Sequence, residues 1–219
     1  MPLHRGAGDV FQEVSSAITA VNGGSPSMSL PAGAVAGDIL ILATVQTGDF
    51  AAYTVAIDSA LTIISELSWN VGADEGLLKL FAVTLSAADI TAGTISWTYT
   101  GAGSAYGIAA VLYRTTETLG TTASVGSQQS SSALSFTANY GGSTAPSINI
   151  LIGGASNNAS TLSMAHTGIT FDTELEDDAV GVTIAMAVEL ITTGNGASGT
   201  ASSNDVDVQA GIAGYAEMS

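Results

Sequence analysis

The stretch of sequence that decides the fold is Ile39–Gln46, ILILATVQ, which follows the pair Gly37-Asp38. A second run of this kind occupies Ile148–Ser156 in the other half of the chain. Continuous apolar runs of this length are typical of strands that are buried on both faces. Apolar residues at helical spacing are scarce, whereas alternation and β-branched residues recur throughout. The two runs therefore predict the central strands of an all-β protein.

Further strands are expected on both sides of these runs, separated by segments rich in Gly, Ser, Asn and Pro that supply turn residues. The predicted strands are Val10–Ala20, Ser27–Leu30, Asp38–Thr47, Leu61–Leu67, Leu77–Ser86, Thr94–Thr100, Ala105–Arg114, Leu134–Ala138, Ser147–Ala155, Gly168–Glu174, Val180–Ile191 and Gln209–Met218. Short strands at this spacing indicate a sandwich or a barrel. We expect two packed antiparallel sheets with a core that includes Ile39, Ile41, Leu80, Ala82, Ile108, Ala110, Ile150, Ile152, Ile184 and Met186.

The two halves of the chain resemble each other in pattern. Each apolar run is followed by a polar segment, a further strand, and then a second apolar stretch, Gly76–Val83 or Gly181–Val188. A strand rich in Gly and Ala closes each half, at Tyr106–Tyr113 and Ala210–Ala216. The pattern fits either a duplicated sheet-forming unit or two sheets that merely use the same residue types, since degenerate repeats are weak signals.

The charge of the chain excludes several classes of function. Its 219 residues include 19 acids and three bases, Arg5, Lys79 and Arg114, for a formal net charge of −16. Residues 118–219 contain no base and nine acids. Binding of nucleic acid requires several Lys or Arg side chains against the phosphates, and an anionic membrane surface attracts basic segments. We therefore expect neither nucleic acid nor membrane as a partner.

The termini and the missing cysteines set further limits. The chain has no cysteine, which leaves no disulfide or thiolate site. Residues 1–6, MPLHRG, lack the apolar core of a signal peptide, and Ile90–Tyr113 is too interrupted by Gly, Thr and Ser to span a bilayer. We expect residues 1–9 to form a flexible N-terminal arm and residues 10–219 a single β-sandwich domain.

Catalytic and cofactor motifs are poorly matched. Gly101–Gly107, GAGSAYG, departs from the nucleotide-binding spacing and is better read as a hairpin turn. A nucleophilic triad needs a base, and the two histidines are His4, in the expected arm, and His166, in an expected surface loop. We therefore predict no enzymatic activity and no organic cofactor.

One acidic segment is a candidate metal site. The stretch Asp172–Asp178, DTELEDD, concentrates the oxygen ligands that Ca²⁺ accepts, and Asp172, Glu174, Asp177 and Asp178 are the candidate ligands. Its spacing does not match the helix–loop–helix calcium loop. A solvated hairpin tip is the favoured alternative.

Residues 118–171 form the chain's longest segment without any charged side chain, 54 positions between Glu117 and Asp172. The segment Gly120–Gly142 is rich in Ser, Thr and Gln and fits either an uncharged connection or a contact surface. Because copies of a chain with charge −16 repel each other, a contact face works best where charges are few. We therefore expect a homo-oligomer or docking to another protein through this segment.

Several short motifs resemble the β-sandwich modules of tailed-phage virion proteins, in which a Pro turn and a Gly-Asp pair lead into a central apolar strand. The matching stretches are Leu30–Gly33, Gly37–Ala43, Leu78–Val83, Gly107–Arg114 and the closing Ala213–Met218. The resemblance extends over most of the chain, from about residue 10 to the end.

This resemblance implies a jelly-roll-like sandwich that serves as a non-enzymatic virion structural protein. The implied roles are capsid decoration, a head fibre or a tail protein, made in the host cytoplasm and in contact with the major capsid protein or other virion proteins. The alternative is a carbohydrate-binding or host-adhesion module, whose exposed rings would come from Trp69, Trp97, Tyr53 or Tyr140. Of the two tryptophans, Trp97 fits core packing and Trp69 is expected to be the exposed ring.

Overall fold

All but one of the predicted strands lie within four residues of their expected bounds in the computed structural model of the chain, and several further strands are present that the sequence did not indicate. The exception is the strand expected at Gly168–Glu174, which occupies Thr173–Ala179. The structure describes residues 12–22, 27–48, 53–57, 59–71, 74–99, 105–130, 133–156, 162–179, 181–204 and 209–219. The elements up to residue 114 are β1 (Gln12–Asn22), β2 (Ser27–Ser29), β3 (Ile39–Thr47), β4 (Tyr53–Ala56), β5 (Thr62–Val71), β6 (Asp74–Thr84), α1 (Ala87–Ala92), β7 (Thr94–Tyr99) and β8 (Ala105–Arg114). The remaining elements are β9 (Leu119–Ser130), β10 (Ser135–Asn139), the 3₁₀ turn Tyr140–Gly142, β11 (Ser147–Ala155), β12 (Met164–His166), β13 (Thr173–Ala179), β14 (Val182–Ile191), β15 (Ser198–Ser203) and β16 (Gln209–Met218).

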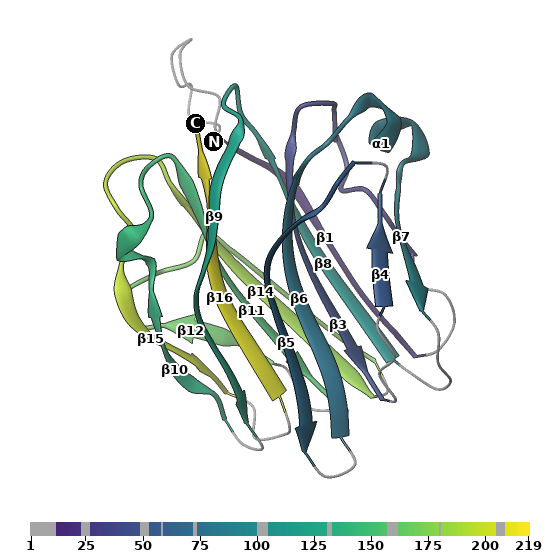
Figure 1. Ribbon diagram of the computed structural model, residues 1–219, viewed down its shortest axis with the longest axis vertical. Helices are drawn as coiled ribbons and strands as arrows, with labels where there is room; N and C mark the ends of the chain where they lie inside the picture. The colour runs from purple at the N-terminus through teal and green to yellow at the C-terminus, as the bar shows by residue number, and fades with distance from the viewer. Residues whose placement is uncertain are drawn as a thin grey trace.

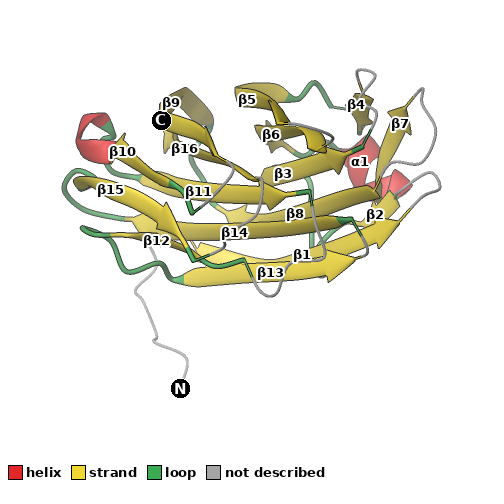
Figure 2. Cartoon of the chain, turned by 90° about the horizontal axis from the view of Figure 1, so that it is seen from below, coloured by secondary structure: helices red, strands yellow, loops and turns green. Residues whose placement is uncertain are grey.

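Two five-stranded antiparallel sheets form the centre of the molecule. One has the strand order β1-β8-β3-β6-β5 and the other the order β13-β14-β11-β16-β9. They pack face to face, so that β1 lies beside β13 at one side of the sandwich and β5 lies beside β9 at the other side (Figure 2). The expected all-β, two-sheet antiparallel sandwich is confirmed.

Each large sheet carries a three-stranded sheet on its outer face (Figure 1). The order is β2-β7-β4 on one side and β10-β15-β12 on the other. One apolar cluster fills the space between the two large sheets, and two further clusters lie beneath the small sheets. The large sheets are therefore buried on both faces, which is why their central strands read as unbroken apolar runs.

The strand order of the first half of the chain is repeated in the second. Adding eight to each label of β1-β8-β3-β6-β5 gives β9-β16-β11-β14-β13, and β2-β7-β4 becomes β10-β15-β12 in the same way. In both halves, strands 1-8-3-6 lie in the large sheet and strands 2-7-4 in the small sheet, and the fifth strand pairs with the sixth in the large sheet. We call β1–β8 the first unit and β9–β16 the second unit.

Strand β3 shows how the local sequence produces the layers. Its nine residues are all buried, with Ile39 and Ile41 directed between the large sheets and Leu40 and Leu42 directed beneath the small sheet. Glycines allow the large sheets to approach closely at their centre. A Cβ atom at Gly154 of β11 would lie 2.6 Å from the Val45 side chain.

Helix α1 joins β6 to β7 in the first unit. Its first residue follows Ser86, whose side chain accepts the amide of Asp89, and the Asp89 carboxylate accepts the amide of Ser86 in return. The helix ends at Gly93, whose φ of 66° is the left-handed conformation that glycine adopts most readily. No helix in the described ranges is long and apolar enough to cross a membrane.

All ten residues predicted for the core are buried, each with at most 1% of its surface exposed. Eight of them lie between the large sheets, whereas Ile108 and Ala110 belong to the cluster beneath the small sheet of the first unit.

Candidate functional site

The acidic segment lies along β13, an edge strand of the second large sheet, and not at a hairpin tip. Exposure alternates along this strand, as expected when successive side chains point to opposite faces. Glu174, Glu176 and Asp178 are exposed on the outer face, whereas Leu175 and Asp177 are half-buried on the face directed toward the first unit.

This alternation separates the candidate calcium ligands. The Asp177 carboxylate accepts the amide of Ala20 on β1 at 2.8 Å, and the Asp172 carboxylate accepts the amide of Leu190 at 2.9 Å. Glu174 and Asp178 lie on the face of the strand opposite to Asp177, and Asp172 precedes the strand. The four residues therefore do not converge, and among the described residues no group of three or more acidic or histidine side chains is placed to hold a metal ion.

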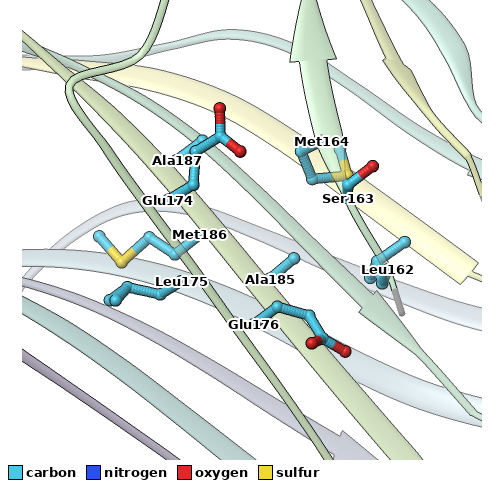
Figure 3. Close-up of a pocket in the computed structure, with 9 residues that line it drawn as sticks. All are labelled: Leu162, Ser163, Met164, Glu174, Leu175, Glu176, Ala185, Met186 and Ala187. Carbon is cyan, nitrogen blue, oxygen red and sulfur yellow. The ribbon is translucent and has the colours of Figure 1, made fainter. Parts of the chain in front are cut away.

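A pocket of about 220 Å³ opens between the outer face of β13–β14 and the segment that contains β12. Its lining is polar and apolar in equal measure, and Leu162, Met164, Ala185 and Ala187 supply apolar side chains. The carboxylate of Glu176 extends toward Leu162, and the side chains of Leu175 and Met186 extend to the opposite side (Figure 3). The pocket thus combines apolar side chains with an acidic rim.

The Glu176 carboxylate is held in an environment that disfavours its charged form. Partial burial raises its pKa, and the negative charges of Asp178 and Asp177 raise it further, against the opposing hydrogen bond from the backbone of Leu162. A carboxylate in this position is stabilised by a positive charge close to it.

The outer edge of β9, at the opposite side of the same sheet, has no charged side chain. On one side β9 pairs with β16, and within the described chain no strand pairs with its other side. Neighbouring β5 adds Ile63, a large apolar side chain with 56% of its surface exposed. The sheet therefore has one acidic edge and one uncharged edge.

Two of the rings considered for sugar binding are buried. Trp69 is 1% exposed within the core between the large sheets, which corrects the expectation that its ring is exposed. Tyr140 is fully buried and donates its hydroxyl to the carbonyl of Ile150 at 2.6 Å. The side chains of Tyr53 and Trp97 lie outside the described residues.

His166 is also placed differently from the expectation. It ends strand β12 instead of lying in a surface loop, and 6% of it is exposed. Its Nε2 lies 3.1 Å from the Ala138 carbonyl, and its Nδ1 accepts the amide of Gly168. Both ring nitrogens are engaged with backbone, which supports a structural role. His4 and most of the Gly101–Gly107 turn lie outside the described residues.

No protein-family model, no curated protein and no solved structure matches this chain.

Proposed function

We propose that this chain is a non-enzymatic structural protein of a phage particle, displayed as a capsid decoration, head fibre or tail component. In this proposal it acts through contacts with its own copies and with the major capsid protein or another virion protein. The observation that carries the proposal of protein–protein contact is the uncharged outer edge of β9. Assignment to a virion comes from the sequence motifs that begin at Leu30–Gly33 and Gly37–Ala43.

The edge of β9 lacks the charged side chains and the proline that often prevent one sheet from pairing with another, although its pairing with β16 is irregular at two places. Exposed edge strands commonly carry charges or proline, whereas β9 carries Ser, Thr, Gln and Gly over twelve residues. Strand β13, at the other edge, carries four carboxylates between Glu174 and Asp178. In a chain of charge −16, another molecule meets less repulsion at β9 than at β13, the other edge of this sheet.

Cosedimentation with empty phage capsids tests this function directly. The wild-type chain is expected to sediment with the particles, and the double variant Ser127→Lys/Gln129→Lys, which adds charge at exposed positions of β9, is expected to lose binding. The control Ala87→Lys/Ala88→Lys adds the same charge at exposed positions of α1. Wild-type protein that neither binds particles nor self-associates in light scattering would contradict the proposal, as would equal binding by both variants.

A further inference from the structure

The two units place a glutamate at the same position but give it different neighbours. Strand β5 pairs with β6 so that Glu66 lies opposite Lys79. Strand β13 pairs with β14 in the corresponding register, and Glu176 lies opposite Ala185. The correspondence follows from the repeated strand order and from the partner strands, because Lys79 and Ala185 each lie three residues before the partner of Thr62 or Thr173. A β-bulge between Ile63 and Ser65 gives β5 one extra residue, so Glu66 follows Thr62 by four positions and Glu176 follows Thr173 by three.

In the first unit this position is occupied by an ion pair within the chain. The Nζ atom of Lys79 lies 2.8 Å from Oε2 of Glu66. The lysine side chain is 13% exposed, so its aliphatic part covers the outer face of β6 while its ammonium reaches the glutamate. The first unit thus shows what fits beside a glutamate at this register.

In the second unit the lysine is replaced by alanine, and the space is open. Ala185 and Glu176 both line the pocket of about 220 Å³. The next outward residue of β14 is Ala187, where β6 has Phe81, so that a second large side chain is missing as well. The pocket therefore corresponds in position to the side chains that the first unit carries and the second unit lacks.

We propose that this pocket binds a lysine side chain supplied by a partner protein. The ammonium group meets the carboxylate of Glu176, and the aliphatic stem packs on Leu162, Met164 and Ala185. Lys79 is the chain's only lysine and is already paired, so a second copy offers no free lysine. The partner is therefore a different protein. This proposal does not depend on the edge of β9, which lies on the other side of the sheet.

An NMR titration of the full chain with Nα-acetyl-lysine N-methylamide at fixed ionic strength tests the proposal. Saturable shifts are expected at the amides of Met164, Ala185 and Ala187. The variant Glu176→Gln is expected to weaken binding by roughly tenfold or more, since an ammonium loses its charged partner. The Ala185→Met variant fills the pocket with an apolar chain and is expected to abolish the shifts.

Matched controls separate a specific site from diffuse screening. Glu117→Gln removes one exposed carboxylate outside the pocket and is expected to leave binding unchanged. The norleucine analogue, which has a similar stem without the ammonium, is expected not to bind. Ala185→Lys supplies the lysine from the chain itself, and we expect it to fold and to block the probe even if Ala185→Met disturbs the sheet.

Four outcomes would overturn the proposal. The first is the absence of saturable shifts in the folded wild type, and the second is that Glu117→Gln weakens binding of the lysine derivative as much as Glu176→Gln does. The third is that the arginine analogue binds more tightly than the lysine derivative. The fourth is that n-butylammonium binds and the lysine derivative does not. The last outcome would assign the pocket to a free alkylamine instead of a protein side chain.

Discussion

The first and second units share one strand order but differ in the charged residues at equivalent positions. In the first unit, Arg114 at the end of β8 donates two hydrogen bonds to Asp38, which is 2% exposed and precedes β3. The equivalent position at the end of β16 is Glu217, which accepts the amide and the hydroxyl of Thr144 at 2.7 and 2.9 Å. Both contacts hold the turn that precedes the central strand of their unit, β3 or β11. The side chain from the last strand is a base in the first unit and an acid in the second.

The same contrast recurs at the outer faces. Lys79 neutralises Glu66 in the first unit, whereas Glu176 faces Ala185 in the second. The first unit thus pairs two of its carboxylates within the chain, and the second unit has no base with which to do so. The comparison shows that the features suited to a partner, the uncharged edge of β9 and the acidic pocket, both belong to the second unit.

The largest expected effect concerns the core between the sheets. Trp69 lies opposite Gly76 in the first unit, and the equivalent pair in the second unit is Ala179 opposite Val182. A Cβ atom at Gly76 would lie 2.0 Å from the Trp69 ring. We expect Gly76→Val to cost about 3 kcal/mol through overpacking and Trp69→Ala about 3–5 kcal/mol through the cavity it leaves.

The double variant Trp69→Ala/Gly76→Val recreates the pair of the second unit. Because the valine refills the space of the indole ring, we expect the double variant to be more stable than the sum of the two changes predicts, by about 2 kcal/mol. Urea unfolding of all four proteins measures this coupling. Additive effects would show that the two units are not equivalent at this position.

The next prediction concerns Asp89, a feature of α1 that the second unit lacks. Burial raises the pKa of this carboxyl, but hydrogen bonds from Ser59 and Ser86 outweigh it and lower the pKa to about 2 from 3.8. The stabilisation is therefore present above pH 4 and is lost as the pH falls toward 2.

We expect Asp89→Asn to be less stable than the wild type by about 1–2 kcal/mol at pH 6, and the difference to vanish near pH 2. Thermal unfolding from pH 2 to 6 measures this difference, with Glu117→Gln as the control. A difference that is independent of pH would contradict the assignment to the ionised carboxylate.

A smaller effect is expected from exchanging the residues beside the two glutamates. Lys79→Ala removes an ion pair whose glutamate side chain is 49% exposed, and Ala185→Lys creates its counterpart in the second unit. Because exposed pairs contribute little, we expect a loss of about 0.5 kcal/mol in the first case and a similar gain in the second. Melting temperatures at low and high salt measure both changes. A salt-independent gain in Ala185→Lys would indicate packing instead of charge.

The smallest expected effect is the difference between Ca²⁺ and Mg²⁺. Because Asp177 and Glu174 lie on opposite faces of β13, added cation should screen the charge of the second unit without a specific site. We expect equal rises in melting temperature with either ion at fixed ionic strength, relative to EDTA. A rise specific to Ca²⁺ that disappears in Asp177→Asn/Asp178→Asn would restore the metal site.

The apolar strands were predictable to within four residues, three of them to the residue, but the polar strands were not. Ala105–Arg114, Ser147–Ala155 and Gln209–Met218 begin and end as predicted. Strands β4, β9, β12 and β15 were missed because they are short, half-exposed, or rich in Ser, Thr and Gly, with little apolar alternation to reveal them. Strand β13 was predicted about five residues too early, since its acids were assigned to a loop.

Register explains why the pocket could not be found from the sequence. The stretches Gly76–Val83 and Gly181–Val188 look alike when their glycines are matched. In the structure, however, the residue of the second unit that is equivalent to Gly76 is Val182, one position after Gly181. In a strand, a shift of one residue moves every side chain to the other face. Matching the glycines therefore places Lys79 against an inward residue and hides its correspondence with Ala185.

The sequence by itself determined the all-β class, the ten core residues and the acidic character of the chain, because these follow from local periodicity and composition. The repeated pattern was visible as well, but not its cause. Only the tertiary structure decided that Trp69 and His166 are buried, that the acids of β13 point to opposite faces, and that Glu176 faces an open pocket. Those facts depend on which strands become neighbours and in which register. Neighbours and register are set by contacts between residues far apart in the chain, and local patterns do not encode them.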